Sequence, residues 1–318
     1  MRIWAAVGCA ALLLSTFAVG QEDVSKAEIK VHKVAGNIYM LEGAGGNIGV
    51  SAGDDGIVIV DDEFAPLAGK IRAALKGIVD KPVRFVINTH YHGDHTGANA
   101  NFAQGGATVI AQDNVRKRME TDGQGGNAGT LKFDYKASPK EGLPIVTFND
   151  RATVWLNGEE IRAIHFPAGH TDGDVVIWFV KSNVVHMGDD FVTYGYPFVD
   201  VLAGGSVTGI IEGCEKVLAT VPKDAKFIPG HGPLSTAEDI RRFVQTVKDT
   251  RAAVAVEVKK GRSLEEIKKA NVLAKWNDSL GKGYLTPEQW VETLYLDITQ
   301  SKGKAKYTPH GHAGEQKH

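Results

Sequence analysis

The sequence predicts an α/β (α+β) fold in which two β-sheets are stacked face to face with helices on the outside. Short β-branched runs alternate with glycine-containing turns from residue 29 onward, and the same order of strands followed by helices returns in the second half of the chain. The composition, with 43% hydrophobic and 23% charged residues, is that of an ordinary soluble globular protein. It excludes a disordered chain, collagen and a multi-span membrane protein.

The first half is predicted to begin with an antiparallel meander formed by the runs at residues 31–43, 46–53 and 56–62. Apolar residues at helical spacing, with Pro66 in the first turn, predict a helix over residues 64–78 that covers one face of this sheet. The next elements are an apolar strand that ends at His90, a strand over 108–111 and a short helix over 112–120. Residues 121–143 are rich in glycine and carry no periodicity, which predicts a loop at the rim of a functional site.

The second half is predicted to contain the second sheet and the long helices. The strands are expected at residues 145–148, 152–156, 160–166, 175–180 and 184–187, with a last one at 226–229. Asn157-Gly158 is a two-residue turn that favours a hairpin. Helices are expected at 206–221, from the capping-box sequence Ser235-Thr236-Ala237-Glu238 to about residue 260, and from Thr286-Pro287 to about residue 299. The C-terminal helices, about residues 236–300, are expected to pack on the second sheet.

Both ends of the chain are set apart from this domain, which is expected to span residues 21–300. Residues 1–20 combine a basic Arg2, an apolar run and small residues near Gly20, a pattern typical of a secretory signal peptide. The run is too short to cross a bilayer, and a single-span anchor is the alternative interpretation. The mature protein is therefore expected to be periplasmic or secreted, without stable membrane insertion. Cys214 would be its only cysteine, which excludes an intrachain disulfide. Residues 301–318 lack periodicity and are expected to be disordered.

The segment His90-Tyr91-His92-Gly93-Asp94-His95 places four potential metal ligands where the apolar strand ends. On an extended segment the side chains of His90 and His92 point the same way, so one cation can contact both. Asp94 and His95 lie beyond the bend at Gly93 and can face a second cation. A structural zinc site is the alternative, but such sites favour thiolates and closed coordination.

Three more candidate ligands, His170, Asp189 and His231, stand at strand ends later in the chain. Each lies beside a glycine, as expected of a ligand loop that needs a close approach of the backbone. Asp190 competes with Asp189 for the same position. A hydrogen-bonded turn carboxylate is the alternative role for Asp189.

Other histidines and carboxylates are expected to support this cluster or to lie away from it. His165 and His186 fall within strand patterns, which places them in the core or next to the ligands. His32 has no motif around it and is expected at the surface. Asp61 and Asp62 close a strand and could accept the second N–H of a ligand imidazole.

The motifs HxHxDH, a separate His, an Asp in a Gly-Asp pair and a His in a Pro-Gly-His-Gly context resemble the metallo-β-lactamase superfamily over about residues 29–235. The resemblance implies an αββα four-layer sandwich and a binuclear site with two zinc ions per chain. By position it assigns His90, His92 and His170 to the first zinc, Asp94, His95 and His231 to the second, and Asp189 to a bridge between them.

The implied chemistry is hydrolysis by a hydroxide shared between two zinc ions, because zinc lowers the pKa of bound water toward neutrality. Asp94 would orient that hydroxide and later protonate the leaving group, which makes it the expected catalytic residue. His92 stands where flavodiiron members carry a carboxylate, which favours zinc over redox iron. Asp189 stands where the clinically known zinc β-lactamases carry Cys or Ser, which puts efficient β-lactam hydrolysis in doubt.

These considerations predict an exported zinc-dependent hydrolase that cleaves a C–N or C–O bond of a small amide or ester, in a β-lactamase-like manner. A lactonase or a glyoxalase II-like thioesterase is the alternative, and a non-catalytic periplasmic metal-binding protein is an alternative of another class. The partner is expected to be a small molecule and not nucleic acid, because the formal net charge is -2 and phosphate binding relies on clustered Lys and Arg. The oligomeric state is left open.

Aromatic residues are expected to frame the substrate pocket. Loop 121–143 carries Phe133 and Tyr135, and segment 190–205 carries Phe191, Tyr194, Tyr196 and Phe198. Such rings suit an apolar or cyclic small molecule. Tyr194 and Tyr196 are the candidate substrate-binding residues, since a tyrosine hydroxyl donates to an oxyanion in some lactonase relatives. A plain packing role is the alternative for each.

Overall fold

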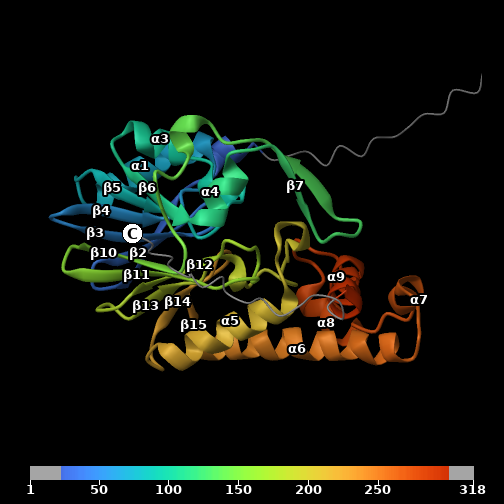
Figure 1. Ribbon diagram of the computed structural model, residues 1–318. Helices are drawn as coiled ribbons and strands as arrows, with labels where there is room; N and C mark the ends of the chain where they lie inside the picture. Colours follow the sequence, from blue (N-terminus) through green and yellow to red (C-terminus); the bar gives the residue numbers. More distant parts are fainter. Residues whose placement is uncertain (1–22, 301–318) are drawn as a thin grey trace, which may run out of the picture.

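A computed structural model describes residues 23–300 and shows four layers: helices, sheet, sheet, helices (Figure 1). Helices α1, α3 and α4 lie over one sheet, and α5 and α6 run beneath the other. This arrangement confirms the predicted fold class. The predicted signal peptide at residues 1–20 and the predicted disordered tail at 301–318 lie outside the described residues. Between residues 23 and 300, none of the helices is long and apolar enough to traverse a bilayer.

The first sheet has the strand order β1-β2-β3-β4-β5-β6-β9. Its first four strands pair antiparallel, as the predicted meander requires, and β5, β6 and β9 extend the sheet in parallel. β4 is buried at every position, which is typical of a central strand covered on both faces. The strands are β1 (Lys30–Ala35), β2 (Ile38–Glu42), β3 (Ile48–Gly53), β4 (Gly56–Val60), β5 (Val83–Ile87), β6 (Thr108–Gln112) and β9 (Val146–Phe148).

The second sheet has the strand order β10-β11-β12-β13-β14-β15, parallel between β13 and β14 and antiparallel elsewhere. Asn157 and Gly158 form the predicted turn between β10 and β11, with φ values of 56° and 66° that match a type I′ hairpin. The strands are β10 (Arg151–Leu156), β11 (Glu159–His165), β12 (Val175–Phe179), β13 (Val184–His186), β14 (Lys226–Ile228) and β15 (Ser235–Thr236). The strand predicted at 226–229 is therefore not the last one.

The helices form the two outer layers. They are α1 (Ala68–Ile78), α2 (Gly93–Thr96), α3 (Asn99–Gln104), α4 (Asp113–Met119), α5 (Val207–Thr220), α6 (Ala237–Lys259), α7 (Leu264–Lys269), α8 (Ala274–Leu280) and α9 (Pro287–Gln300). The capping box of α6 joins Thr236 and Asp239, one residue later than predicted. Val247 of α6 and Trp290 of α9 share a core cluster with Phe227 of β14, which confirms that the C-terminal helices pack on the second sheet. Of the five described helices with seven residues or fewer, α4 was predicted and α2, α3, α7 and α8 were not, because periodicity is a weak signal over so few residues.

Two sequence-based predictions about residues 121–148 are wrong. The strand predicted at 145–148 is an edge strand of the first sheet, since β9 pairs with β6 and not with the second-half strands. Residues 121–143 are not an irregular loop but contain an antiparallel hairpin of β7 (Gly123–Gly126) and β8 (Lys132–Tyr135). Figure 1 shows this hairpin extending from the first half toward the C-terminal helices. The glycine-rich β7 lacks the side-chain alternation by which strands are recognised.

Candidate metal centre

The candidate ligands lie in segments that follow strands of both sheets. After β5 the chain turns into the short helix α2, whose N-cap is His92, so the backbone bends between His92 and Asp94. Of the later candidates, His170 lies between β11 and β12, Asp189 lies in the 3-10 helix η4 (Gly188–Asp190) after β13, and His231 follows β14. A Cβ atom at Gly169 would collide with Asp190 Oδ1, and one at Gly230 would collide with Asp189 Oδ1. The glycines beside the ligands therefore permit the predicted close approach.

The structure brings all seven predicted side chains together. Within the described part of the chain, potential ligand atoms approach to within 4.8 Å of one another in the groups His90, His92 and His170; His90, His95 and Asp189; and Asp94, His95 and His231. The group of His90, His92 and His170 and the group of Asp94, His95 and His231 coincide with the two zinc sites that the family resemblance implies, and are called the first and the second group below. Asp189 lies between them. The binding of zinc itself stays a prediction.

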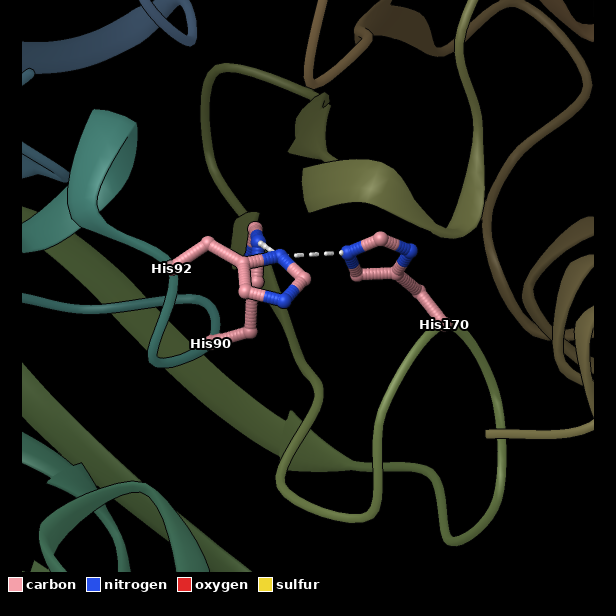
Figure 2. A group of neighbouring side chains, drawn as sticks. All are labelled: His90, His92 and His170. Carbon is pink, nitrogen blue, oxygen red and sulfur yellow. Dashed lines mark hydrogen bonds between the residues drawn. The ribbon is translucent and has the colours of Figure 1, made fainter. Parts of the chain in front are cut away.

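In the first group, ring nitrogens face one another at hydrogen-bonding distance. His92 Nδ1 lies 3.1 Å from His90 Nε2 and 2.9 Å from His170 Nε2 (Figure 2). The outer nitrogens are used as donors: His92 Nε2 to Asp200 Oδ2 at 3.0 Å and His170 Nδ1 to the Phe198 carbonyl at 2.8 Å. When the outer nitrogen of a neutral imidazole donates, its inner nitrogen carries a lone pair that can bind a cation. A cation between the inner nitrogens could be coordinated by all three rings, and imidazole suits zinc.

In the second group, potential ligand atoms also face one another, and carboxylate oxygens are among them. His95 Nδ1 donates to Asp61 Oδ2 at 2.8 Å, which directs Nε2 toward the other candidate ligands. Asp189 Oδ1 lies 3.3 Å from His95 Nε2, and the other oxygen lies 3.6 Å from His231 Nε2 and 3.7 Å from His170 Nε2. Asp189 Oδ1 is buried and has no hydrogen-bond partner among the described residues. These positions fit a carboxylate that bridges two cations.

The electrostatics of the two groups differ. Burial lowers the pKa of His170 to about 4, and burial and neighbouring imidazoles hold the pKa of His90 well below its usual range, so both rings are neutral at pH 7. Burial also opposes a charge on His95, but Asp189, Asp94 and Asp61 raise its pKa well above the usual value. The second group therefore attracts a positive charge, which is a proton when no metal is bound.

The carboxylates and histidines around the ligands have separate roles. Asp61 accepts from a ligand imidazole as predicted, whereas Asp62 accepts from Ala98 N at 2.9 Å and does not have the predicted role. Asp190 accepts from His170 N at 2.9 Å, so it supports the ligand loop and leaves the bridging position to Asp189. His186 is buried and bonds to Asn47 O at 2.8 Å, next to the strand end that carries Asp189. His165 bonds to the Asp174 carbonyl at 2.8 Å, and His32 pairs with Glu42 near the surface at 3.0 Å.

Sequence reasoning missed Asp200, which is fully buried beside the first group. Its Oδ2 accepts from His92 Nε2 at 3.0 Å and from the Tyr91 hydroxyl at 2.6 Å. Its Oδ1 accepts from Gly126 N at 2.9 Å and Ala203 N at 3.0 Å. Asp200 thus orients a candidate ligand and anchors the β7–β8 hairpin. No motif marks it, and the only available signal was a carboxylate in the segment 190–205.

Aromatic rings surround the centre, but not all of those predicted. The Phe198 ring lies 5.5 Å from that of His170 and 5.8 Å from that of Tyr284, which sequence reasoning missed. The Tyr194 ring lies 5.3 Å from that of His231, so Tyr194 adjoins the ligands. Tyr196 instead bonds to Asn277 at 3.0 Å and stacks on Trp290, with 1% of its surface exposed. Its contacts are those of a packing residue and do not support the predicted substrate-binding role.

Comparisons with known proteins agree with this geometry. The sequence profile of the metallo-beta-lactamase superfamily matches residues 33–231, more than half of the chain. The chain is 29% identical over 148 residues to the 2,4-dinitroanisole O-demethylase subunit alpha of Nocardioides sp., a match that covers 44% of this chain and 40% of the relative. It is 26% identical to the hydroxyacylglutathione hydrolase of Methylococcus capsulatus (64% and 68%) and 26% identical to the metallo-beta-lactamase type 2 of Bacteroides fragilis (34% and 44%).

The chain thus spans less than half the length of two of these relatives. Among solved structures, it is similar to a metallo-beta-lactamase from Pontibacter korlensis with a TM-score of 0.57 and 16% identity, covering 70% of this chain and 99% of that one. It is also similar to a double mutant of the sec-alkyl sulfatase PisA1, with a TM-score of 0.63 and 15% identity over 86% and 50% of the two chains. At these identities the structural likeness shows the fold alone.

Proposed function

This chain belongs to the metallo-beta-lactamase superfamily, and on that basis we propose that it is a zinc-dependent hydrolase that cleaves a C–N or C–O bond of a small carbonyl compound. Two zinc ions in the candidate centre would supply a water nucleophile at neutral pH and polarise the substrate carbonyl. One observation carries the proposal: ring nitrogens of His90, His92 and His170 converge on one another beside Asp189 Oδ1, which is buried and makes no hydrogen bond among the described residues. Bound cations would satisfy all of these atoms.

The residues of this chain would have separate roles in the proposed reaction. The seven clustered side chains would hold the two ions, with Asp189 lying between the two groups of ligands. Asp94 lies with its Oδ2 3.2 Å from His231 Nε2, and 30% of its side chain is exposed. It can therefore accept a proton from the attacking water and deliver it to the leaving group. The Tyr194 hydroxyl, on the His231 side of the centre, would donate to the oxyanion that develops on the substrate.

A lactonase or thioesterase is the second candidate function. The match to hydroxyacylglutathione hydrolase covers 64% of this chain, against 34% for the metallo-beta-lactamase type 2, which favours an ester or thioester over a lactam. The match to the linear primary-alkylsulfatase of Pseudomonas sp., 22% identical over 80% of this chain and 50% of the relative, adds sulfate esters to the substrates worth testing. A non-catalytic metal-binding protein is the candidate of another class.

We also propose that the protein is exported, on the pattern of residues 1–20, and that it acts in the periplasm or outside the cell. Its partner would be a small molecule and not nucleic acid, in keeping with a net charge of -2. N-terminal sequencing of protein recovered from the periplasm would test the export. A full-length protein confined to the cytoplasm would contradict it.

The function is tested by measuring bound metal and turnover on the same preparation. We expect two zinc ions per chain and hydrolysis of at least one member of a chromogenic panel of lactams, lactones, esters, thioesters and sulfate esters. The substrate that is turned over distinguishes the candidates. Two zinc ions without turnover on any class would support the non-catalytic protein, and a chain that binds no zinc would overturn the proposal.

A further inference from the structure

A cavity of about 290 Å³ lies beside the candidate metal centre and under the β7–β8 hairpin. It is lined by Tyr91 and His92 of the ligand segment, Ala100 of α3, Met119 of α4, and Phe133 and Tyr135 of β8. The cavity shares His92 with the first ligand group, so a molecule in it would reach the edge of the metal centre. None of the catalytic roles described above uses this space.

The lining of the cavity suits an apolar group. The Tyr91 hydroxyl already donates to Asp200, and the Thr96 hydroxyl already donates to the His92 carbonyl at 3.1 Å. Lys136 is the only lysine or arginine among the lining residues. Its side chain is 84% exposed and its ammonium lies 2.7 Å from Asp122. The cavity therefore offers aromatic and aliphatic surface and no buried, unpaired charge to hold an ionic group.

Two buried carboxylates hold the hairpin over the cavity. Asp200 Oδ1 accepts from Gly126 N at 2.9 Å at one end of the hairpin turn. Glu292 of α9, with 4% of its surface exposed, accepts from Thr130 N at 2.8 Å and from Asn127 Nδ2 at 3.3 Å. The hairpin is thus tied to both the ligand segment and the C-terminal helices. A cavity held open in this way binds without first having to order its walls, which favours affinity.

We propose that this cavity binds the apolar part of the substrate, an alkyl chain or an aryl ring, while the scissile bond lies at the metal centre. The inference rests on the proposed function and adds a substrate class to it. A dry apolar cavity of roughly 150 Å³ accommodates a benzene ring. The observed volume of about 290 Å³ therefore corresponds to a naphthyl group or a chain of similar size. Esters or amides with such an uncharged group are the expected substrates.

A binding measurement tests the cavity without relying on turnover. Naphthalene is titrated into the zinc-loaded protein and followed by its fluorescence. Ala100→Leu fills the cavity from α3, and Gln104→Leu adds the same side chain to an exposed position of the same helix as a control. We expect the affinity for naphthalene to fall at least about tenfold in Ala100→Leu and to be unchanged in Gln104→Leu. If Ala100→Leu does not fold, Ala100→Val replaces it. This smaller side chain should cause a smaller loss of affinity for naphthalene.

A kinetic comparison then tests whether substrates use the cavity. We expect kcat/KM for ethyl octanoate, followed by the acid released, to fall at least about tenfold in Ala100→Leu, with ethyl acetate, which has neither a long chain nor a ring, changed less than about twofold. Equal naphthalene binding by wild type, Ala100→Leu and Gln104→Leu, or an unchanged octanoate-to-acetate ratio, would overturn the inference. If naphthalene binds as expected but no ester is hydrolysed by the wild type, the proposed ester hydrolysis fails while the apolar site stands.

Discussion

Replacing Asp61 by Asn tests how the structure prepares His95 to bind a cation. Asp61 is fully buried; its Oδ1 accepts from Thr89 N at 2.7 Å, and its Oδ2 accepts from Thr89 Oγ1 at 2.7 Å and His95 Nδ1 at 2.8 Å. An amide cannot accept at both ends. If its NH₂ faces His95, the imidazole must lose the proton on Nδ1 and carry its remaining proton on Nε2, the atom that faces the other ligands. If its NH₂ faces Thr89 N, two donors oppose each other in a buried position.

The magnitude follows from comparing the protein with and without zinc. Without zinc the first orientation costs little, because a proton on His95 Nε2 can be donated to Asp189 Oδ1, 3.3 Å away. With zinc only the second orientation leaves Nε2 bare, and it leaves the buried Thr89 N–H unsatisfied at a cost of about 1–3 kcal/mol. Zinc affinity should therefore fall by about 5- to 150-fold, since about 1.4 kcal/mol is a factor of ten. This range includes the roughly 10–100-fold loss usual when a ligand's hydrogen-bond partner is replaced.

The assay is a zinc titration against a competing chelator, with the second equivalent of zinc as the readout. Asp62→Asn is the matched control: Asp62 is equally buried but accepts from Ala98 N. Burial raises the pKa of Asp62 well above its usual value, and the amide oxygen of Asn can still accept from Ala98 N. We expect the control to bind both zinc ions with wild-type affinity. Wild-type affinity in Asp61→Asn, or an equal loss in both variants, would refute the reasoning.

Four further predictions concern catalysis, metal, the hairpin and pH. Asp94→Asn should keep the circular dichroism spectrum and lower kcat about 10²- to 10⁴-fold on the substrate that the panel identifies. A chelator should lower the melting temperature, and zinc should restore it. Glu292→Ala should speed amide hydrogen exchange at Thr130, because its buried acceptor is lost. Burial lowers the pKa of His165 below its ordinary value of 6.5, so its contribution to stability is present above about pH 6.5 and lost as the pH falls. In urea unfolding, the His165→Asn variant should lose less free energy of unfolding than the wild type between about pH 7 and pH 5.

The ligand set was predictable because metal ligands are identified by their residue types and by short spacings in the sequence. Histidine and aspartate at strand ends are rare enough to be informative, and the alternation of an extended segment already places His90 and His92 on one side. The choice of Asp189 over Asp190 agrees with the structure, in which Asp190 bonds to the His170 backbone. The alternation of strands and helices likewise indicated two stacked sheets, since each amphipathic element must bury one face.

The parts that were missed depend on contacts between distant segments. Asp200 accepts hydrogen bonds from four residues in three segments of the chain, and Tyr284 reaches the centre from the loop before α9. Nothing local distinguishes either residue from others of its type. The same holds for β9, whose membership of the first sheet is decided by its pairing with β6. Tyr196 was predicted to line the pocket only because it lies close in sequence to Tyr194. Neighbouring residues of an irregular segment, however, point in different directions.

The placement of the ligands ties cation binding to the packing of the two sheets. The segment from His90 to His95 follows β5 of the first sheet, whereas His170 and His231 belong to the second half, so each ligand group spans the interface. Asn47, which precedes β3, adds hydrogen bonds to Pro229 O at 2.9 Å and Gly232 O at 2.8 Å across the same interface. A site assembled from two layers has its geometry only while the layers are packed. The free energy of cation binding therefore also stabilises the sandwich, and a change in the core between the sheets would alter metal affinity without touching a ligand.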